Sequence, residues 1–141
     1  MHNVGLFLSK IYVIDCRNSN GADIVFVVDG SGSIGAANFV LIKNFIRSAV
    51  DVFDVGLGPT QTRVGLIQFS TAVVHEFYLT TYTNKTQLLA VINNLPYRGG
   101  GTQTHLAVDA MRTVSYTEAR GARPLDNGEI LRIRCREKYA A

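Results

Sequence analysis

The sequence contains no tryptophan, only two cysteines and three prolines, and no long uninterrupted apolar run. Two cysteines, Cys16 and Cys135, are too few for a disulfide scaffold, and their spacing is not that of metal ligands. They can form one disulfide in an oxidising compartment or remain thiols. No apolar run approaches the roughly 20 residues of a membrane helix, so we expect no membrane span. Charged residues make up 18% and hydrophobic residues 47% of the 141, which excludes a disordered chain and predicts one globular domain.

Most of the chain carries no net charge. Residues 1–119 carry eight Lys or Arg and eight Asp or Glu, so the net charge of +3 comes from residues 120–141. A protein that binds nucleic acid presents a basic face, and here no such face is spread over the domain. We therefore expect no nucleic-acid partner and interpret the basic end as a solvated segment.

Hydrophobic periodicity predicts strands that alternate with helices. Residues 22–29 are continuously apolar and β-branched, as in a strand that is covered on both faces of a parallel sheet. Residues 38–53 carry apolar side chains at the spacing of one helical face. The remaining predicted elements are a strand at 62–70, an antiparallel strand at 72–79, a helix capped by Thr83 or Asn84 and ending at 95, a glycine-rich loop at 96–104, and a helix from Thr104 past Val114. This order is typical of an α/β fold.

The stretch DIVFVVDGSGSIG, residues 23–35, places a carboxylate and two hydroxyls at the carboxyl end of the first strand, where open α/β sheets bind ligands. Gly30, Gly32 and Gly35 fit the GxGxxG pattern of dinucleotide-binding enzymes. Asp29, however, would repel a pyrophosphate, and the next strand ends in QFS rather than in an acid for the ribose. A purely structural role explains the glycines and serines as turn and cap residues. It does not explain Asp29, because an unpaired carboxylate is costly to bury.

Asp29, Ser31 and Ser33 can instead bind a metal ion. They occupy alternate positions in a turn, so their side-chain oxygens can converge. Carboxylate and hydroxyl oxygens are hard ligands that suit Mg²⁺ or Mn²⁺. A single carboxylate leaves such an ion with net positive charge and open positions, so the ion would attract a carboxylate from another molecule.

Three motifs resemble the von Willebrand factor type A domain. DIVFVVDGSGSIG is similar to the DxSxS half of its metal-ion-dependent adhesion site, RVGLIQFS to its second strand, and LPYRGGGTQTHLAVDAM to its next motif loop. The resemblance covers about residues 20–124 and looks closest to fibril-associated collagens and matrilins. It implies that Thr102 is a fourth metal ligand, with Thr104 as the helix cap. It also implies adhesion rather than turnover, an extracellular setting, and a matrix partner such as collagen or another chain with this domain.

Beyond Pro124 the sequence departs from the family pattern, in which a buried strand with a TDG-like turn supplies a fifth site residue. Residues 125–141 include apolar residues that alternate with arginines, as in an edge strand. We therefore divide the chain into an N-terminal segment at 1–20, an incomplete type A domain at 21–124, and a divergent basic tail at 125–141. A splice variant, a shifted reading frame or a gene-model error would each produce such a tail.

An incomplete domain would have only the first three strands of the family sheet. The hydrogen-bonding edge of strand 22–29 would then be bare and open to aggregation or to pairing with another chain. Residues 129–135, EILRIRC, are one segment that can pair there. We do not expect Asp126 to replace the missing ligand, because nothing places it at a strand end. The alternatives to adhesion are a nucleotide-binding α/β enzyme that uses GSGSIG and a truncated product without binding activity.

The remaining motifs are short. Residues 1–14 are largely apolar, but Lys10 interrupts them and the basic start and cleavage site of a signal peptide are missing. The tripeptide NKT at residues 84–86 is an N-glycosylation sequon, which fits secretion. His75 and His105 form no recognisable catalytic order with the serines, so we expect no enzymatic activity.

Overall fold

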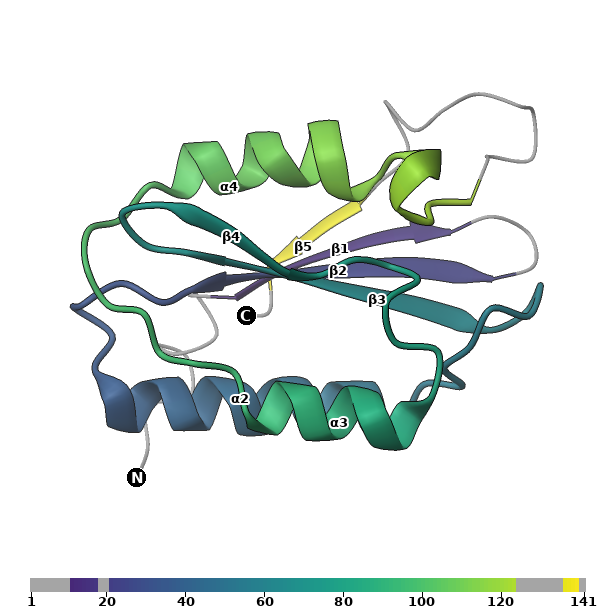
Figure 1. Cartoon of the computed structure of the whole chain (residues 1–141), viewed down its shortest axis with the longest axis horizontal. Helices are drawn as coiled ribbons and strands as arrows, with labels where there is room; N and C mark the ends of the chain where they lie inside the picture. Colours follow the sequence, from purple (N-terminus) through teal and green to yellow (C-terminus); the bar gives the residue numbers. More distant parts are fainter. Residues whose placement is uncertain (1–10, 18–20, 124–135, 140–141) are drawn as a thin grey trace.

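The computed structural model describes residues 11–17, 21–123 and 136–139, which form a five-stranded mixed sheet between two layers of helices (Figure 1). The strands are β1 (Ile11–Arg17), β2 (Ala22–Asp29), β3 (Thr62–Phe69), β4 (Val73–Phe77) and β5 (Arg136–Tyr139). The helices are α2 (Ala36–Asp51), α3 (Lys85–Asn93) and α4 (Thr104–Ala110), followed by a π-helical turn at Met111–Ser115 and a 3₁₀ turn at Glu118–Arg120. The predicted α/β class is confirmed.

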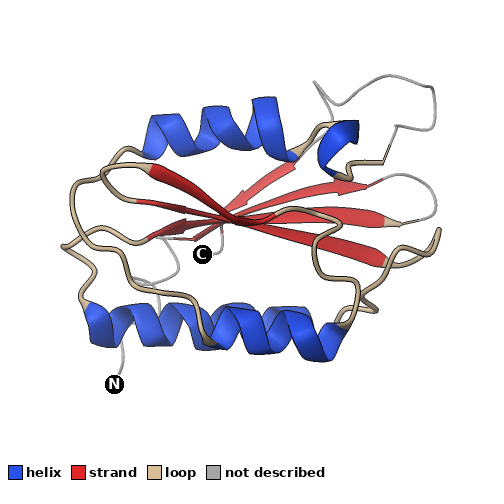
Figure 2. Cartoon of the chain, in the orientation of Figure 1, coloured by secondary structure: helices blue, strands red, loops and turns tan. Residues whose placement is uncertain are grey.

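The strand order is β4-β3-β2-β1-β5, with β2 and β3 parallel and the other neighbours antiparallel (Figure 2). Helices α2 and α3 cover one face of the sheet, and α4 covers the other (Figure 1). Because successive side chains of a strand point to opposite faces, both faces of β2 must be apolar. Phe26 and Val28 pack in the α2/α3 core, whereas Val25 and Val27 pack in the α4 core. The predicted doubly covered strand is therefore confirmed.

The helices follow the predicted apolar faces. Phe39, Ile42, Ile46 and Val50 are the buried residues of α2. Asn84 caps α3, because its Oδ1 accepts a hydrogen bond from the backbone N–H of Gln87 at 3.2 Å. Helical backbone continues past Val114 as predicted, but its last five residues have π-helical hydrogen bonding. The expectation that Thr104 caps this helix was wrong, because Thr104 is the first helical residue and Gln103 occupies the N-cap without a side-chain hydrogen bond. Within the described ranges, no helix is long and apolar enough to cross a membrane.

The prediction that the hydrogen-bonding edge of β2 is bare was wrong. β1 pairs antiparallel with β2 over seven residue pairs, and β5 pairs antiparallel with β1. A central strand needs partners for its buried N–H and C=O groups, and β1 provides them on the side opposite β3. The alternative pairing segment at 129–135, together with Asp126 and Cys135, lies outside the described residues.

A buried ion pair lies at the amino end of β2. The Nη1 of Arg123 donates to Oδ1 of Asp23 at 3.0 Å, and the backbone N–H of Arg123 donates to Oδ2 at 2.7 Å. Only 9% of the Arg123 side chain and 3% of the Asp23 side chain are exposed. Burial raises the pKa of Asp23 against the opposing effect of Arg123, and burial also lowers the pKa of Arg123. The pair fixes the last residues of the 21–123 range to the end of the sheet.

Candidate functional site

The carboxyl end of β2 carries Asp29, which is only 2% exposed. Its Oδ1 accepts a hydrogen bond from the backbone N–H of Ser31 at 2.9 Å, the bond by which aspartate stabilises a turn two residues ahead. This turn places Oγ of Ser31 3.2 Å from Oγ of Ser33. Ser31 is buried and Ser33 is exposed. Three of the four predicted ligands therefore lie in one tight turn.

The glycine-rich loop packs against this turn. The N–H of Gly32 donates to the carbonyl of Gly100 at 2.8 Å, and the N–H of Gly99 donates to the carbonyl of Gly30 at 2.9 Å. Thr102, two residues after Gly100, is exposed. Figure 1 shows the loop running from the end of α3 to the start of α4, along the edge where α2 begins. The fold thus brings the segment that carries Thr102 to the same edge of the sheet as Asp29.

Two residues that no sequence motif indicated hold this loop. The hydroxyl of Tyr97 donates to the carbonyl of Ser31 at 2.8 Å and accepts the N–H of Gly35 at 3.2 Å. Gln68 in β3, 1% exposed, donates from Nε2 to the carbonyl of Pro96 at 2.9 Å. The available signals in the sequence were a polar side chain in an apolar strand and an aromatic residue two positions before a run of three glycines.

The turn does not offer the phosphate cradle of a dinucleotide site. Such a cradle needs backbone N–H groups that point at the ligand. The N–H of Gly30 instead donates to the carbonyl of Phe69 at 2.8 Å. The N–H groups of Gly32 and Gly35 donate to Gly100 and Tyr97, as described above. All three glycine amides of the GxGxxG pattern are therefore used within the chain.

The donor set fits a hard divalent cation. It combines one buried carboxylate with neighbouring hydroxyl oxygens, which suit Mg²⁺ or Mn²⁺ better than a metal that prefers nitrogen or sulfur. Across the described ranges, no three His, Cys, Asp or Glu side chains gather where they could hold a metal. A cation here would therefore depend on neutral oxygens in addition to Asp29.

The strand beside β2 affects the ligand set. β1 runs antiparallel to β2, so Ile11 at its beginning pairs with Val28 next to the site. A parallel neighbour would end at this edge and could supply a strand-end aspartate like Asp29. The described part of β1 begins there with Ile11 instead, so it provides no counterpart of the fifth site residue that the family resemblance implies.

The sequence profile of the von Willebrand factor type A domain matches residues 23–132. The chain belongs to the von Willebrand factor type A family. Matrilin-2 of Mus musculus is 36% identical over 110 residues, which are 78% of this chain and 11% of the matrilin. The collagen alpha-4(VI) chain of Mus musculus is 42% identical over 105 residues, which are 74% of this chain and 4% of the collagen. The type A chain described here thus spans a small part of the length of these matrix relatives.

A solved type A structure is also similar. Proximal thread matrix protein 1 from the mussel byssus, in a form with a zinc-occupied metal-ion-dependent adhesion site motif, superposes with a TM-score of 0.66. The two chains are 27% identical, and the match covers 78% of this chain and 29% of the mussel protein. The family resemblance and the fold predicted from the sequence are confirmed by these comparisons.

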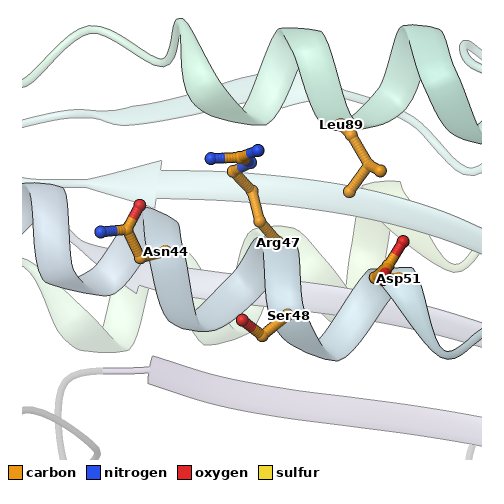
Figure 3. Close-up of a pocket in the computed structure, with 5 residues that line it drawn as sticks. All are labelled: Asn44, Arg47, Ser48, Asp51 and Leu89. Carbon is orange, nitrogen blue, oxygen red and sulfur yellow. The ribbon is translucent and has the colours of Figure 1, made fainter.

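A hollow of about 360 Å³ lies apart from the predicted ligands. It is lined by Asn44, Arg47, Ser48, Asp51 and Leu89, so it follows the exposed side of α2 toward α3 (Figure 3). None of the four predicted ligands lines it. Its residues therefore provide controls for substitutions at the edge of β2.

Proposed function

We propose that this type A domain is an extracellular adhesion module. Asp29, Ser31, Ser33 and Thr102 would hold Mg²⁺ or Mn²⁺, and the cation would bind an acidic group of a matrix protein. The observation that carries the proposal is the Ser31–Ser33 hydroxyl pair, 3.2 Å apart, in the turn that follows the buried Asp29. Residues 21–124 form the proposed binding module.

Each ligand has a distinct role in this proposal. Asp29 supplies the negative charge that favours a cation, and the hydroxyl residues supply neutral oxygens that leave the ion with net positive charge. Ser33 and Thr102 are exposed, so a partner can approach them from solvent. A bound divalent cation supplies the positive charge that attracts a glutamate or aspartate of the partner.

The relatives support a matrix setting for this activity. Matrilin-2 and the collagen alpha-4(VI) chain are matrix proteins, and the mussel protein contains zinc in the corresponding motif. We therefore propose secretion, and as partner a collagen or another chain with a type A domain. The proposed activity is binding, and it requires no covalent step.

Cation binding is tested first, by thermal unfolding with millimolar MgCl₂, with MnCl₂, and with EDTA. A ligand that binds only the folded state stabilises it, by about 2.7 kcal/mol at one hundred times its dissociation constant. We expect either cation to raise the melting temperature of the wild type. Ser33→Ala and Thr102→Ala should reduce this rise, whereas Ser48→Ala, in the hollow of Figure 3, should retain it. A wild-type melt that neither cation shifts contradicts the proposed site.

Adhesion is tested separately on collagen-coated surfaces. We expect the chain to be retained in MgCl₂ and released by EDTA, and we expect Ser33→Ala to be retained poorly. Ser48→Ala is again the matched control, because it removes an exposed serine hydroxyl from the body of α2. Retention that survives EDTA would mean that the domain binds collagen without the cation.

A further inference from the structure

The sequon at residues 84–86 lies at the amino end of α3, and it is the one N-x-S/T tripeptide of the sequence. Asn84 and Thr86 are both exposed. Asn84 precedes the helix and has extended backbone angles, with φ −114° and ψ 126°. The acceptor residue therefore lies on the surface at the N-cap, where its backbone is extended and its carbonyl accepts the first helical hydrogen bond, from the N–H of Leu88 at 3.0 Å.

The cap and a carbohydrate would use different atoms of Asn84. Its Oδ1 caps α3 by accepting the N–H of Gln87, as described above. Its Nδ2 makes no hydrogen bond to any described residue. An N-linked glycan is attached through this nitrogen and leaves the carbonyl oxygen as an acceptor. The side chain of Lys85 is held aside, because its Nζ donates to the carbonyl of Asp51 at 2.9 Å.

The sequon also lies far from the candidate cation site. The contact between Lys85 and Asp51 places the sequon beside the last residue of α2. The candidate site lies just before the first residue of α2. With 16 residues at 1.5 Å each, the two ends of α2 are about 24 Å apart. Figure 1 shows α3 beginning at the edge where α2 ends, opposite the glycine-rich loop. A glycan on Asn84 would leave the edge of Asp29 open.

We propose that Asn84 is an N-glycosylation site, an inference that rests on the secretion included in the proposed function. The donor class is an oligosaccharide linked to a polyprenyl pyrophosphate. Nδ2 of Asn84 forms a bond to the anomeric carbon of the sugar and releases one proton. The bond from that carbon to the pyrophosphate oxygen breaks, and the polyprenyl pyrophosphate leaves with the electron pair.

The test expresses the whole chain in mammalian cells, with a secretory leader in front and a reporter sequon appended at the end. The reporter shows that the chain has entered the secretory pathway. Gel mobility of total cell protein and of medium is compared before and after removal of N-glycans by a glycosidase. We expect two glycans on the wild type and on Thr86→Ser, and one on Thr86→Ala and on Asn84→Asp. Asn84→Asp is the sharpest variant, because aspartate also caps helices well.

A wild-type chain that carries only the reporter glycan overturns the inference. This result is independent of the cation site, because the same material can be melted with and without MgCl₂. A cation shift without a glycan on Asn84 would reject the modification and leave the proposed function intact. A glycan on Asn84 without a cation shift would support the modification and contradict the proposed cation site. We expect the cation shift to be the same before and after removal of the glycan, because the two sites lie at opposite ends of α2.

Discussion

The hydroxyl of Tyr97 donates a hydrogen bond to the carbonyl oxygen of Ser31 over 2.8 Å. The same hydroxyl accepts the N–H of Gly35, so one side chain holds both ends of the turn that contains Ser33. The ring itself packs on Phe39, with 5.2 Å between the centroids. Tyr97 is therefore a positioning residue for the proposed ligands, and its substitution should affect cation binding as well as stability.

Tyr97→Phe keeps the ring and removes both hydrogen bonds. We expect a loss of about 1–3 kcal/mol in the free energy of unfolding, because two backbone groups lose their partner. We also expect a several-fold weaker affinity for Mg²⁺, measured by calorimetric titration at a temperature where both proteins are folded. Tyr82→Phe is the control, because the described structure gives that hydroxyl no hydrogen-bond partner while its ring contacts Phe77. Unchanged Mg²⁺ affinity in Tyr97→Phe would show a purely structural role.

Gly99 and Gly100 have positive φ angles of 69° and 93°, in the region that favours glycine. A Cβ at Gly99 meets nothing within 4 Å, whereas a Cβ at Gly100 would lie 2.5 Å from Oγ1 of Thr71. Gly99→Ala should therefore lower the free energy of unfolding by only about 1–2 kcal/mol, the cost of holding a non-glycine residue in the left-handed region. Gly100→Ala should cost more and should also displace Thr71, whose hydroxyl accepts the N–H of Gly101 next to Thr102.

Chemical denaturation measures the two glycine variants, and thermal melts with MgCl₂ measure the cation effect. We expect Gly100→Ala to lose most of the Mg²⁺ shift and Gly99→Ala to retain more of it. Equal behaviour of the two variants would mean that the contact with Thr71 does not position the loop.

Patterns among neighbouring residues predicted most strands and helices of this molecule. They did not predict the contacts between residues that are far apart in the sequence. The apolar run of β2, the helical face of α2 and the alternate spacing of Asp29, Ser31 and Ser33 depend on neighbours in sequence. The role of Tyr97 depends on Ser31, 66 residues away, and that of Arg123 depends on Asp23, 100 residues away. No periodicity encodes such pairs.

β1 was missed for a different reason. The predicted N-terminal segment at 1–20 includes residues 11–17, although IYVIDCR has the β-branched and aromatic residues of a strand. The sequence NSNG at residues 18–21 consists of residue types that favour turns, and two strand-like runs on either side of such a sequence predict a hairpin. This signal would have predicted the partner that covers the edge of β2.

The Asp23–Arg123 pair predicts a large effect of one substitution. Arg123→Met leaves a buried carboxylate without its cation, which costs about 3–5 kcal/mol. Adding Asp23→Asn should recover part of this loss. Arg112→Met is the matched control, because its pair with Asp109 has side chains that are 59% and 61% exposed, and it should change stability little.

The loss of stability in Arg123→Met should depend on pH, because it comes from the charge of Asp23. Burial already raises the pKa of Asp23, and removal of Arg123 removes a group that lowers it. A raised pKa in the folded state favours the protonated form, so the associated stability is present at low pH and lost as pH rises. Urea denaturation should therefore show a smaller deficit for Arg123→Met at pH 4 than at pH 7. A deficit that grows toward low pH would contradict a buried Asp23 charge as the cause.

His75 in β4 predicts the pH dependence of the wild type. Its ring stacks on Tyr78 at 5.2 Å, and the guanidinium of Arg120 lies 4.3 Å from the centre of the Tyr78 ring. Burial, and then the charge of Arg120, lower the pKa of His75 from its usual 6.5. The unfolded chain therefore takes up a proton first, and the stability due to neutral His75 is lost as pH falls from 6.5 through the folded value.

His75→Gln should remove this loss, because glutamine does not titrate and can still hydrogen-bond to Ser115, whose Oγ lies 3.5 Å from Nδ1 of His75. We expect the free energy of unfolding, measured in urea between pH 7.5 and 5, to fall less steeply in His75→Gln than in the wild type. His105→Gln, an exposed substitution in the first turn of α4, should retain the wild-type slope. If His75→Gln keeps the wild-type slope, other groups must account for the acid sensitivity. If it flattens the slope, protonation of His75, whose pKa burial and Arg120 lower, accounts for the stability that is lost toward pH 5.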